Sequence, residues 1–287
     1  KKNKKNFFHK KINISNFYNL KKEFNRIKPN VVINFAAETH VDNSIISSKK
    51  FINSNIYGTF NLLECSRLYL KKNNSKNFKF IQISTDEVFG DLKIKDKKKF
   101  TELSKLSPSS PYSASKASAD LLVGAWQRTY DLPTIITRSA NNFGPYQNKE
   151  KLIPKTIINI IKRKKIPIYA KGKNIRNWIY VEDNIEAISK IIKYGDIGTS
   201  YNIGSKNELS NINIVKLICY EMSRKFSKYT YQQNLDLIKF VKDRPGHDER
   251  YSLNINKIKK LNWKEKYTLK NGIKKTIDWY LKNKNEF

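Results

Sequence analysis

Short apolar runs alternate with longer amphipathic stretches through the first half of the chain. The runs Asn30–Ala36, Phe78–Ser84 and Thr134–Arg138 have the length and composition of buried strands. Apolar residues at helical spacing fill the two segments between them, Phe51–Leu70 and Ser113–Tyr130. This β–α–β–α–β order predicts a parallel sheet that is covered by helices on both faces.

The pattern changes from Gly144 onward, where the expected elements become shorter. The expected helices are Leu152–Lys164, Glu182–Lys193, Asn211–Lys225 and Leu269–Lys282, and the expected strands are Pro167–Ala170 and Ser200–Ile203. We therefore expect two domains, one of residues 1–144 and a smaller α/β domain of residues 145–287 that is interleaved with the first.

Helical spacing also indicates which side chains share a face. Within Phe51–Leu70, the residues near one face are Ile52, Ile56, Phe60, Leu63 and Arg67. Cys65 and Cys219 fall within helical patterns, and we expect them to be buried small side chains. Such sparse cysteine usage suits a reducing compartment, so we predict a cytoplasmic protein.

The composition is that of a globular protein, with 39% hydrophobic and 12% aromatic residues among 287. No apolar run has membrane-spanning length, and the basic segment Lys1–Lys11 lacks the apolar stretch of a secretion signal. The three histidines, His9, His40 and His247, show no metal-ligand spacing, so we predict no metal site.

The net charge of +32 raises the possibility of a nucleic-acid-binding protein. The denser basic runs Lys1–Lys11, Lys93–Lys99 and Lys162–Lys165 are far apart, however, and no zinc-finger or RNA-binding motif accompanies them. The charge is better explained by a lysine-rich composition spread over the surface, which would attract an anionic substrate. We predict no nucleic-acid partner.

The start of the chain lacks one expected feature of a dinucleotide-binding fold. Such a fold needs a glycine-rich turn after its first strand, where the backbone approaches the pyrophosphate. The first glycine is Gly58, and the only methionine is Met222. We therefore expect a Rossmann-like doubly wound sheet whose first βαβ segment is missing from these residues.

Tyr112 and Lys116 are the first candidate catalytic pair. Residues four apart share a helix face, and an ammonium group beside a phenol favours the phenolate, so we expect a lowered Tyr112 pKa. The phenol could then take a proton from a substrate hydroxyl as a hydride leaves for NAD⁺. The alternative is a surface lysine that lies along an aromatic ring.

A second candidate group, Ser84-Thr85-Asp86-Glu87, follows the strand that ends near Ile83. Ligands bind beyond the carboxyl ends of strands in open α/β sheets. Two neighbouring carboxyl groups allow an acid and a base with different pKa values, as an elimination requires. The alternative is a polar strand exit without a chemical role.

Eight motifs in order resemble those of the dTDP-glucose 4,6-dehydratases, from about residue 12 to the C-terminus. They are Ala36-Ala37-Glu38-Thr39-His40-Val41-Asp42, Ser84-Thr85-Asp86-Glu87-Val88-Phe89-Gly90, residues 108–116 (PSSPYSASK), Asn141-Asn142-Phe143-Gly144-Pro145, Glu150-Lys151-Leu152-Ile153-Pro154, Arg176-Asn177-Trp178, Tyr201-Asn202-Ile203-Gly204 and Asp243-Arg244-Pro245-Gly246-His247-Asp248. Phe89 and Phe143 stand where the family often has tyrosine.

The resemblance implies a three-step dehydration with NAD as cofactor. Tyr112, with Thr85 and Lys116, would assist oxidation of the sugar at C4. Glu87 would then remove the C5 proton, and Asp86 would protonate the departing C6 hydroxyl. Hydride return to C6 would give a 4-keto-6-deoxy sugar nucleotide.

The resemblance also implies binding roles and an assembly. The cofactor-binding residues would be Asn13 (in place of the usual Asp), Ile14, Phe35, Ala36, Ala37, Glu38, Thr39, Ser54, Tyr112, Lys116 and Asn142. The substrate-binding residues would be Thr39, Thr85, Asn141, Lys151, Leu152, Pro167, Tyr169, Arg176, Asn211, Arg244 and His247. The family implies a homodimer joined through parts of Phe51–Leu70 and Ser113–Tyr130.

Three readings of the function remain distinct. The first is dehydration of dTDP-glucose, and the second is a dehydratase or epimerase for another nucleotide sugar, such as a UDP-linked one. The Asp86–Glu87 pair argues against a plain epimerase, which needs no elimination. The third is the basic nucleic-acid-binding protein, which salt-dependent binding to random DNA would support.

Overall fold

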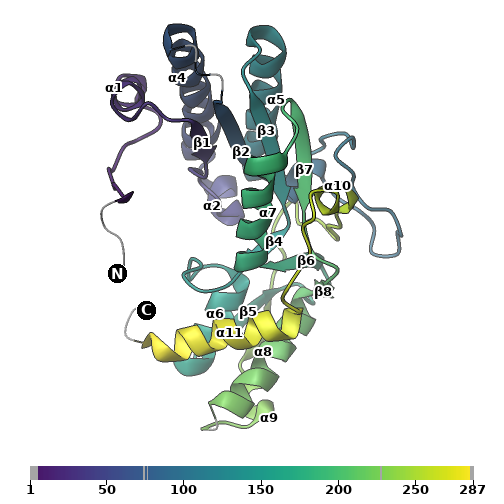
Figure 1. The fold of residues 1–287 in the computed structure, drawn as a ribbon. Coiled ribbons are helices and arrows are strands. Elements are labelled where there is room, and N and C mark those ends of the chain that lie inside the picture. The colour runs from purple at the N-terminus through teal and green to yellow at the C-terminus, as the bar shows by residue number, and fades with distance from the viewer. Residues whose placement is uncertain (1–5, 74, 76, 227, 285–287) are drawn as a thin grey trace.

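The computed structural model describes residues 6–73, 75, 77–226 and 228–284, so part of the predicted basic segment, Lys1–Lys5, lies outside the described residues. A four-stranded parallel sheet occupies the upper half of the molecule (Figure 1). Its strands, in spatial order, are β1 (Val31–Asn34), β2 (Lys79–Thr85), β3 (Thr134–Ser139) and β7 (Thr199–Ile203). The four strands of this sheet were predicted from the sequence and are confirmed, although the first ends at Asn34.

Helices cover both faces of this sheet. They are α1 (Phe17–Ile27), α4 (Gly58–Asn73), α5 (Pro111–Tyr130) and α7 (Val181–Tyr194). Successive residues of a strand point to opposite faces, and on β2 Phe80 joins Leu63 and Val123 in one apolar cluster. Ile81 joins Ile188 of α7 in another. Both faces are therefore buried, and the doubly wound α/β class is confirmed.

The predicted helix at Phe51–Leu70 exists, and Leu63 of its predicted face is fully buried, but the first turns differ from the expected pattern. The chain runs through α2 (Val41–Ile46), α3 (Lys49–Phe51) and the π-helical segment η2 (Ile52–Tyr57) into α4. Ile52 is 51% exposed, whereas Phe51 and Asn55 are almost fully buried. A π turn holds an extra residue, so it rotates the following side chains away from the regular helical repeat.

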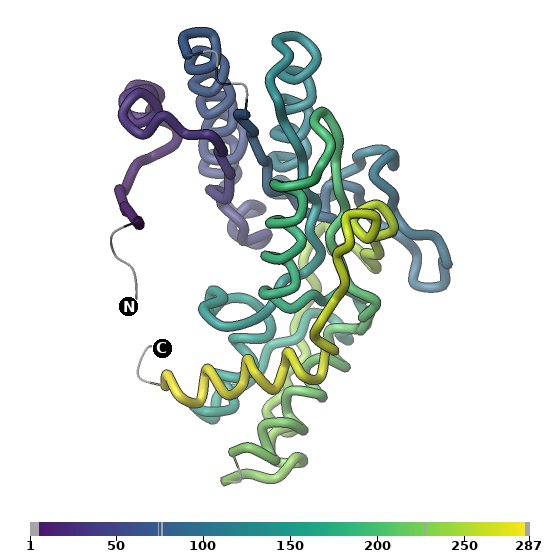
Figure 2. The backbone as a smooth tube through the Cα atoms, in the orientation of Figure 1, coloured from purple at the N-terminus to yellow at the C-terminus, as the bar shows by residue number. Residues whose placement is uncertain are grey.

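The lower half of the molecule holds two small sheets and a helical layer. Its strands are β4 (Asn141–Phe143), β5 (Ile166–Tyr169), β6 (Ile175–Tyr180), β8 (Glu208–Ser210) and β9 (Ile238–Val241). Its helices are α6 (Leu152–Ile161), α8 (Asn211–Lys225), α9 (Tyr231–Leu235) and α11 (Leu269–Lys282), whereas the short helix α10 (Asn256–Lys259) packs against β7 of the upper sheet. The helices α6, α8 and α11 lie close together in the lower half (Figures 1 and 2). They share one apolar core that includes Ile157, Ile218 and Ile277.

The two halves are not consecutive in sequence. The strand β7 and the helix α7 belong to the later part of the chain, yet β7 pairs with β3 through Thr137↔Tyr201 and its neighbours. The strand β4 leaves the upper sheet immediately after β3 and pairs with β6 in the lower half. The chain therefore crosses between the halves more than once, which places residues from both beside the cavity described below.

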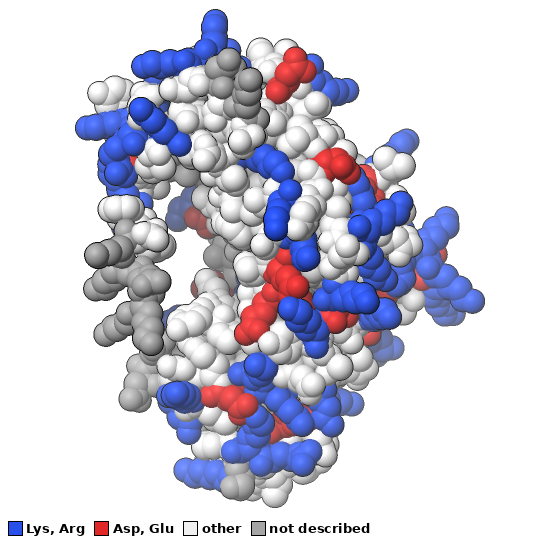
Figure 3. Space-filling model, viewed as in Figure 1, with Lys and Arg blue, Asp and Glu red and all other residues white. Residues whose placement is uncertain are grey.

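Basic side chains lie over both halves of the face in Figure 3, with acidic side chains among them. Several of these acids are paired, such as Glu208 with Arg250 and Glu186 with Lys266. Within the described ranges, no helix is long and apolar enough to cross a membrane.

Candidate active site

The carboxyl ends of β1 and β2 bring the first candidate residues to one edge of the sheet. β2 ends at Thr85, and the 3₁₀ turn η3 (Asp86–Phe89) begins at the next residue. The Thr85 hydroxyl accepts a hydrogen bond from the Glu87 N–H at 3.3 Å, which caps this turn. Asp86 and Glu87 therefore have a fixed backbone at the strand exit, as the sequence predicted.

Asp86 is sealed from solvent, with 1% of its surface exposed. The Thr85 hydroxyl donates a hydrogen bond to one carboxyl oxygen at 3.2 Å, and the other oxygen has no partner among the described residues. Burial, together with the nearby charge of Glu87, raises the pKa of Asp86 to about 8. Asp86 therefore holds a proton at neutral pH, as a general acid must.

Glu87 has a different environment from its neighbour. It is half-buried and lines a cavity that Asp86 does not reach. Burial raises the pKa of Glu87, but the charges of Arg244, Lys151 and Arg176 oppose this rise. A carboxyl group that opens into a cavity among cations is suited to accept a proton from a bound molecule.

Tyr112 and Lys116 lie on the first turns of α5. The helix begins at Pro111 behind a capping box formed by Ser110 and Ser113, which fixes the position of Tyr112. The Tyr112 N–H donates to the Ser44 hydroxyl at 3.1 Å, so α2 also holds this turn. Both side chains are buried, which excludes the alternative of a surface lysine along a ring.

The expectation of a lowered Tyr112 pKa is wrong for this structure. Burial and the charge of Glu87 raise the pKa of Tyr112, and the Thr85 hydroxyl only partly opposes them. The Lys116 ammonium donates to the Ile83 carbonyl at 2.5 Å, and burial lowers the pKa of Lys116 to about 8. The helical spacing is as predicted, but desolvation of the phenol is the largest influence on its pKa.

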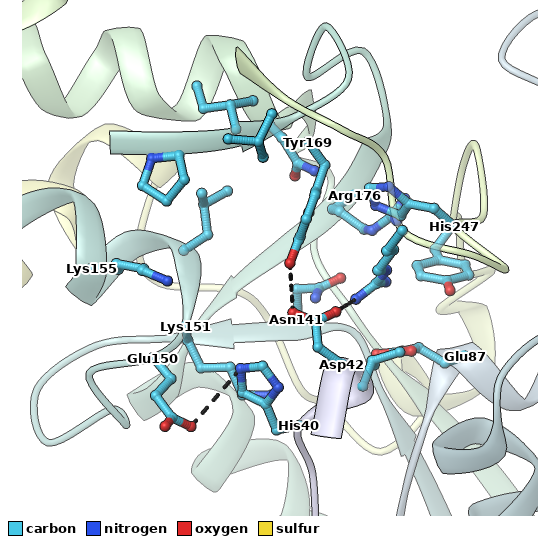
Figure 4. Close-up of a pocket in the computed structure, with 18 of the residues that line it drawn as sticks. His40, Asp42, Glu87, Asn141, Glu150, Lys151, Lys155, Tyr169, Arg176 and His247 are labelled. Atoms are coloured by element: carbon cyan, nitrogen blue, oxygen red, sulfur yellow. Dashed lines mark hydrogen bonds and ion pairs between the residues drawn. The ribbon is translucent and has the colours of Figure 1, made fainter. Parts of the chain in front are cut away.

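A cavity of 370 Å³ lies beside Glu87, between the two halves of the molecule (Figure 4). Nine of the predicted substrate residues line it: Asn141, Lys151, Leu152, Pro167, Tyr169, Arg176, Asn211, Arg244 and His247. Thr39 and Thr85 do not line it. The Thr39 carbonyl accepts a hydrogen bond from Lys151 Nζ at 2.7 Å, and Thr85 is buried beside Asp86.

The two arginines of the cavity are held differently. Arg176 is 5% exposed, and its two terminal nitrogens donate to the Ile175 and Asp248 carbonyls at 2.8 and 3.0 Å. Its guanidinium also lies over the Tyr251 ring, 4.3 Å from the ring centre. Arg244 makes a looser contact, 3.5 Å from Nη1 to Asp42. Arg176 is thus fixed in place, whereas Arg244 keeps donors available to a ligand.

The predicted cofactor residues fall into two groups near this edge. The run Phe35–Thr39 follows β1, and the Asn55 side chain bonds both the N–H and the carbonyl of Glu38, at 2.9 and 3.0 Å. The second group includes Asn13 and Ile14, whose neighbour Ser15 donates its hydroxyl to the Asn53 carbonyl at 3.0 Å. This contact brings them beside η2, which contains Ser54. Asn142 lies on β4, next to the cavity residue Asn141.

Several cavity residues received no role from the sequence. They are His40, Val41, Asp42, Glu150, Lys155, Ile168, Trp178, Val241 and Tyr251. Five of them, His40, Val41, Asp42, Glu150 and Trp178, stand inside motifs that the resemblance used. That position is the signal that could have found them, but their contacts depend on segments distant in sequence.

Comparison with known proteins agrees with this geometry. The family model described as GDP-mannose 4,6 dehydratase matches residues 1–276. A dTDP-glucose 4,6-dehydratase of Shigella flexneri is 48% identical over 276 residues, which cover 91% of this chain and 75% of that protein. The chain belongs to the dTDP-glucose 4,6-dehydratase family. A probable member from Sinorhizobium fredii is 46% identical over 267 residues, covering 91% of this chain and 74% of that protein.

Solved structures of the family have the same fold. The dTDP-glucose 4,6-dehydratase DesIV of Streptomyces venezuelae, with NAD and TYD bound, is 34% identical, with a TM-score of 0.86. The alignment covers 96% of this chain and 80% of that one. The Bacillus anthracis dTDP-glucose 4,6-dehydratase, in complex with NAD, is 38% identical over 99% of this chain and 83% of that one, with a TM-score of 0.83. A UDP-glucose 4-epimerase of Thermus thermophilus, at 22% identity, shares the fold alone.

Proposed function

We propose that the protein is an NAD-dependent lyase that converts dTDP-glucose to dTDP-4-keto-6-deoxyglucose. The observation that carries this proposal is the difference between Asp86 and Glu87. One carboxyl group is sealed and protonated, and its neighbour opens into the cavity. An elimination needs such an acid and base side by side. Family membership, with relatives near 45% identity that bear this activity in their names, supports the same reaction.

The residues present fit part of a bound NAD, because the glycine-rich turn for the pyrophosphate is not among them. The run that follows β1 leaves Phe35 54% exposed, while Asn55 fixes the backbone at Glu38. The buried Asn142 Oδ1 has no hydrogen-bond partner among the described residues, so an acceptor is available there. When bound, NAD⁺ would accept a hydride from the sugar and later return it.

Tyr112 and Lys116 would manage the proton of the C4 hydroxyl. The Tyr112 phenol would take this proton as C4 is oxidised, and the Thr85 hydroxyl beside it would bond the same oxygen. Because the Tyr112 pKa is raised in this structure, the phenol is protonated before substrate enters. The phenol must therefore lose its own proton to solvent before it can take the proton of the C4 hydroxyl, and the Lys116 charge would favour that phenolate.

Glu87 and Asp86 would then complete the elimination. The new C4 ketone makes the C5 proton acidic, and the Glu87 carboxylate would remove it from the cavity side. Asp86 would donate its proton to the departing C6 hydroxyl, which leaves as water. Asp86 would thus act in the protonated state that its surroundings favour, whereas the charges of Arg244, Lys151 and Arg176 would favour the ionised form of Glu87 against its burial.

The cations of the cavity would bind the nucleotide diphosphate. Arg176 on β6 offers a fixed guanidinium, and Arg244, in the segment after β9, offers N–H donors. Lys151 lies between Thr39 and Glu87 and would add a third positive charge. Tyr169, which packs edge-on against His247 with 5.8 Å between ring centres, would supply an aromatic surface for the base.

A dehydratase for another nucleotide sugar remains the second candidate. The aromatic surface at Tyr169 would accept uracil as well as thymine. The predicted homodimer and the cytoplasmic location remain predictions too. Exposed apolar side chains on α5 and η2, among them Leu121 and Tyr57, support the homodimer.

The decisive experiment is incubation of the purified protein and NAD with dTDP-glucose. Mass spectrometry should show loss of one water from the sugar nucleotide. After mild alkali treatment, a 4-keto product should give an absorbance that the substrate does not give. UDP-glucose serves as the matched control for the base. Equal turnover of both substrates would contradict thymidine selectivity, and no turnover of either would overturn the proposal.

A further inference from the structure

Asp42 joins three segments of the cavity wall that are far apart in sequence. The Tyr169 hydroxyl donates to Asp42 Oδ2 at 2.7 Å, and Arg244 Nη1 lies 3.5 Å from Asp42 Oδ1 (Figure 4). Asp42 belongs to the first turn of α2, Tyr169 ends β5, and Arg244 follows β9. One carboxylate therefore sets the positions of two side chains on the opposite wall.

The surroundings of Asp42 keep it ionised. Its side chain is 31% exposed, so water still reaches it. Partial burial raises the pKa of Asp42, but the hydrogen bond from Tyr169 and the charges of Arg244 and His40 outweigh burial and lower it overall. The Tyr169 pKa is raised to about 12, so this phenol remains protonated and donates.

Arg244 depends on Asp42 more than Arg176 depends on any carboxylate. The Arg244 side chain is 17% exposed, and its buried Nε has no hydrogen-bond partner among the described residues. Its guanidinium contacts Asp42 at the cavity wall, and we infer that this contact orients it toward the cavity. Without that carboxylate, the flexible side chain would sample other rotamers before a ligand arrives.

We propose that Asp42 is a positioning residue of the nucleotide site, which holds Tyr169 and Arg244 in the orientation that receives the base and the diphosphate. This inference rests on the proposed function of the cavity. Asp42 acts through its two partners and does not react itself. Its removal should therefore weaken binding of the nucleotide and leave the chemical step almost unchanged.

The test compares Asp42→Ala and Asp42→Asn with the parent protein. Calorimetric titration with dTDP should give a Kd about tenfold higher for Asp42→Ala, because both partners lose their orientation. Asp42→Asn keeps an oxygen for Tyr169 and should fall between the two. Steady-state kinetics with dTDP-glucose should show a similar rise in KM, with kcat within about twofold of the parent. Asn43→Ala, at the next position of α2 and outside the cavity, is the matched control and should change neither constant.

A double-mutant cycle with Tyr169→Phe provides the sharper readout. Phenylalanine keeps the ring but removes the hydroxyl that Asp42 accepts. If Asp42 acts through this hydroxyl, Asp42→Ala should raise the Kd for dTDP less in the Tyr169→Phe background than in the parent. Equal effects in both backgrounds would overturn the coupling.

The outcomes separate the inference from the function on which it rests. A parent protein that fails to bind dTDP would overturn the proposed function itself. A parent that binds, with Asp42→Ala binding equally well, would overturn the positioning role alone. A loss of kcat with unchanged KM and Kd would also overturn it, since Asp42 would then act in the chemistry. If Asp42→Ala does not fold, as judged by circular dichroism, Asp42→Asn carries the same comparison.

Discussion

Burial, more than charge pairing, sets the proton affinities of the catalytic residues. Asp86, Tyr112 and Lys116 are each less than a tenth exposed, and burial shifts the pKa of each in the direction that favours its neutral form. Desolvation always opposes the charged form, so it acts on an acid, a phenol and an amine in the same sense. Asp86 and Tyr112 therefore stay protonated until a bound substrate supplies new hydrogen-bond partners.

The first residue-scale prediction separates the two carboxyl groups. Glu87→Gln should still allow C4 oxidation, since Tyr112 and Lys116 remain, but an amide cannot remove the C5 proton. NADH should accumulate, with little solvent deuterium at C5. Asp86→Asn should exchange C5 yet fail to release C6 hydroxide. Each defect should cost about 10²–10⁴-fold in turnover.

Mass spectrometry of the sugar nucleotide after reaction in D₂O, beside NADH absorbance, measures both variants. The control is Asp131→Asn, which makes the same change from carboxyl to amide at the exposed C-cap of α5 and should behave as the parent. C5 exchange at the parent rate in Glu87→Gln would show that another group is the base.

A second prediction follows from the raised pKa of Asp86. The pKa of an Asp in the unfolded chain is about 3.9, whereas the pKa of Asp86 in the folded protein is about 8. Between these values the folded state holds a proton that the unfolded state has lost. The stability contribution of Asp86 is therefore full below pH about 4 and falls as pH rises toward about 8.

Asn cannot titrate, so Asp86→Asn should gain stability relative to the parent across this range. We expect the difference in free energy of unfolding to grow by about 1–3 kcal/mol between pH about 5 and about 8. Urea denaturation at both pH values measures it, with Asp131→Asn as the control. A difference that does not depend on pH would mean that Asp86 is ionised in the folded protein.

At the scale of elements, the π segment η2 connects the sheet edge to α5. Asn55, almost fully buried on η2, bonds the Glu38 backbone twice and donates to the Ser115 hydroxyl at 2.8 Å. The wider turn points Asn55 inward where a regular helix would place a different side chain. One amide thus aligns the proposed cofactor loop with the helix that carries Tyr112.

The corresponding prediction concerns Asn55→Ala. Loss of this amide removes two hydrogen bonds to the Glu38 backbone and one to the buried Ser115 hydroxyl, so the free energy of unfolding should fall by about 1–3 kcal/mol. The loop should also loosen, and the Kd for NAD should rise about fivefold or more. Calorimetry and urea denaturation measure the two effects. Asn53→Ala, which removes an exposed side chain from the same π segment, should change neither.

At the scale of the whole molecule, the cavity exists because the two halves interleave. Glu87 and Asp42 come from the upper half, and Tyr169, Arg176 and Arg244 come from the lower half. β7 anchors the later chain to the upper sheet through its pairing with β3. Substrate binding therefore depends on how the halves pack as well as on the identity of each side chain.

The whole-molecule prediction tests the homodimer. Leu121 on α5 is 66% exposed, among other exposed apolar side chains of the predicted interface. Leu121→Glu would place a charge in that interface, so sedimentation velocity should show a shift from dimer toward monomer. Leu103→Glu changes a 96% exposed leucine in a loop and should leave the assembly intact. A parent protein that sediments as a monomer would contradict the prediction.

The sequence predicted those parts of the fold that local patterns encode. The helices α5, α8 and α11 and the strands β2 and β3 lie where apolar periodicity and caps placed them, within about two residues. The helix α1 and the strands β6 and β9 were missed. The helix α1 has apolar residues at helical spacing, Phe17, Leu20, Phe24 and Ile27, after the N-cap Asn16, so its pattern could have been found. The strands β6 and β9 are short and mix charged and apolar residues, so no period stands out there.

The sequence by itself determined the order of the elements, the chemical identity of the candidate groups and the helical spacing of Tyr112 and Lys116. Only the tertiary structure decided their surroundings. The raised Tyr112 pKa and the buried face at η2 both differ from the expectations of spacing. The contacts of Asp42 span 127 and 202 residues. The physical reason is that periodicity and capping are local, whereas desolvation and distant contacts arise only when the two halves pack together.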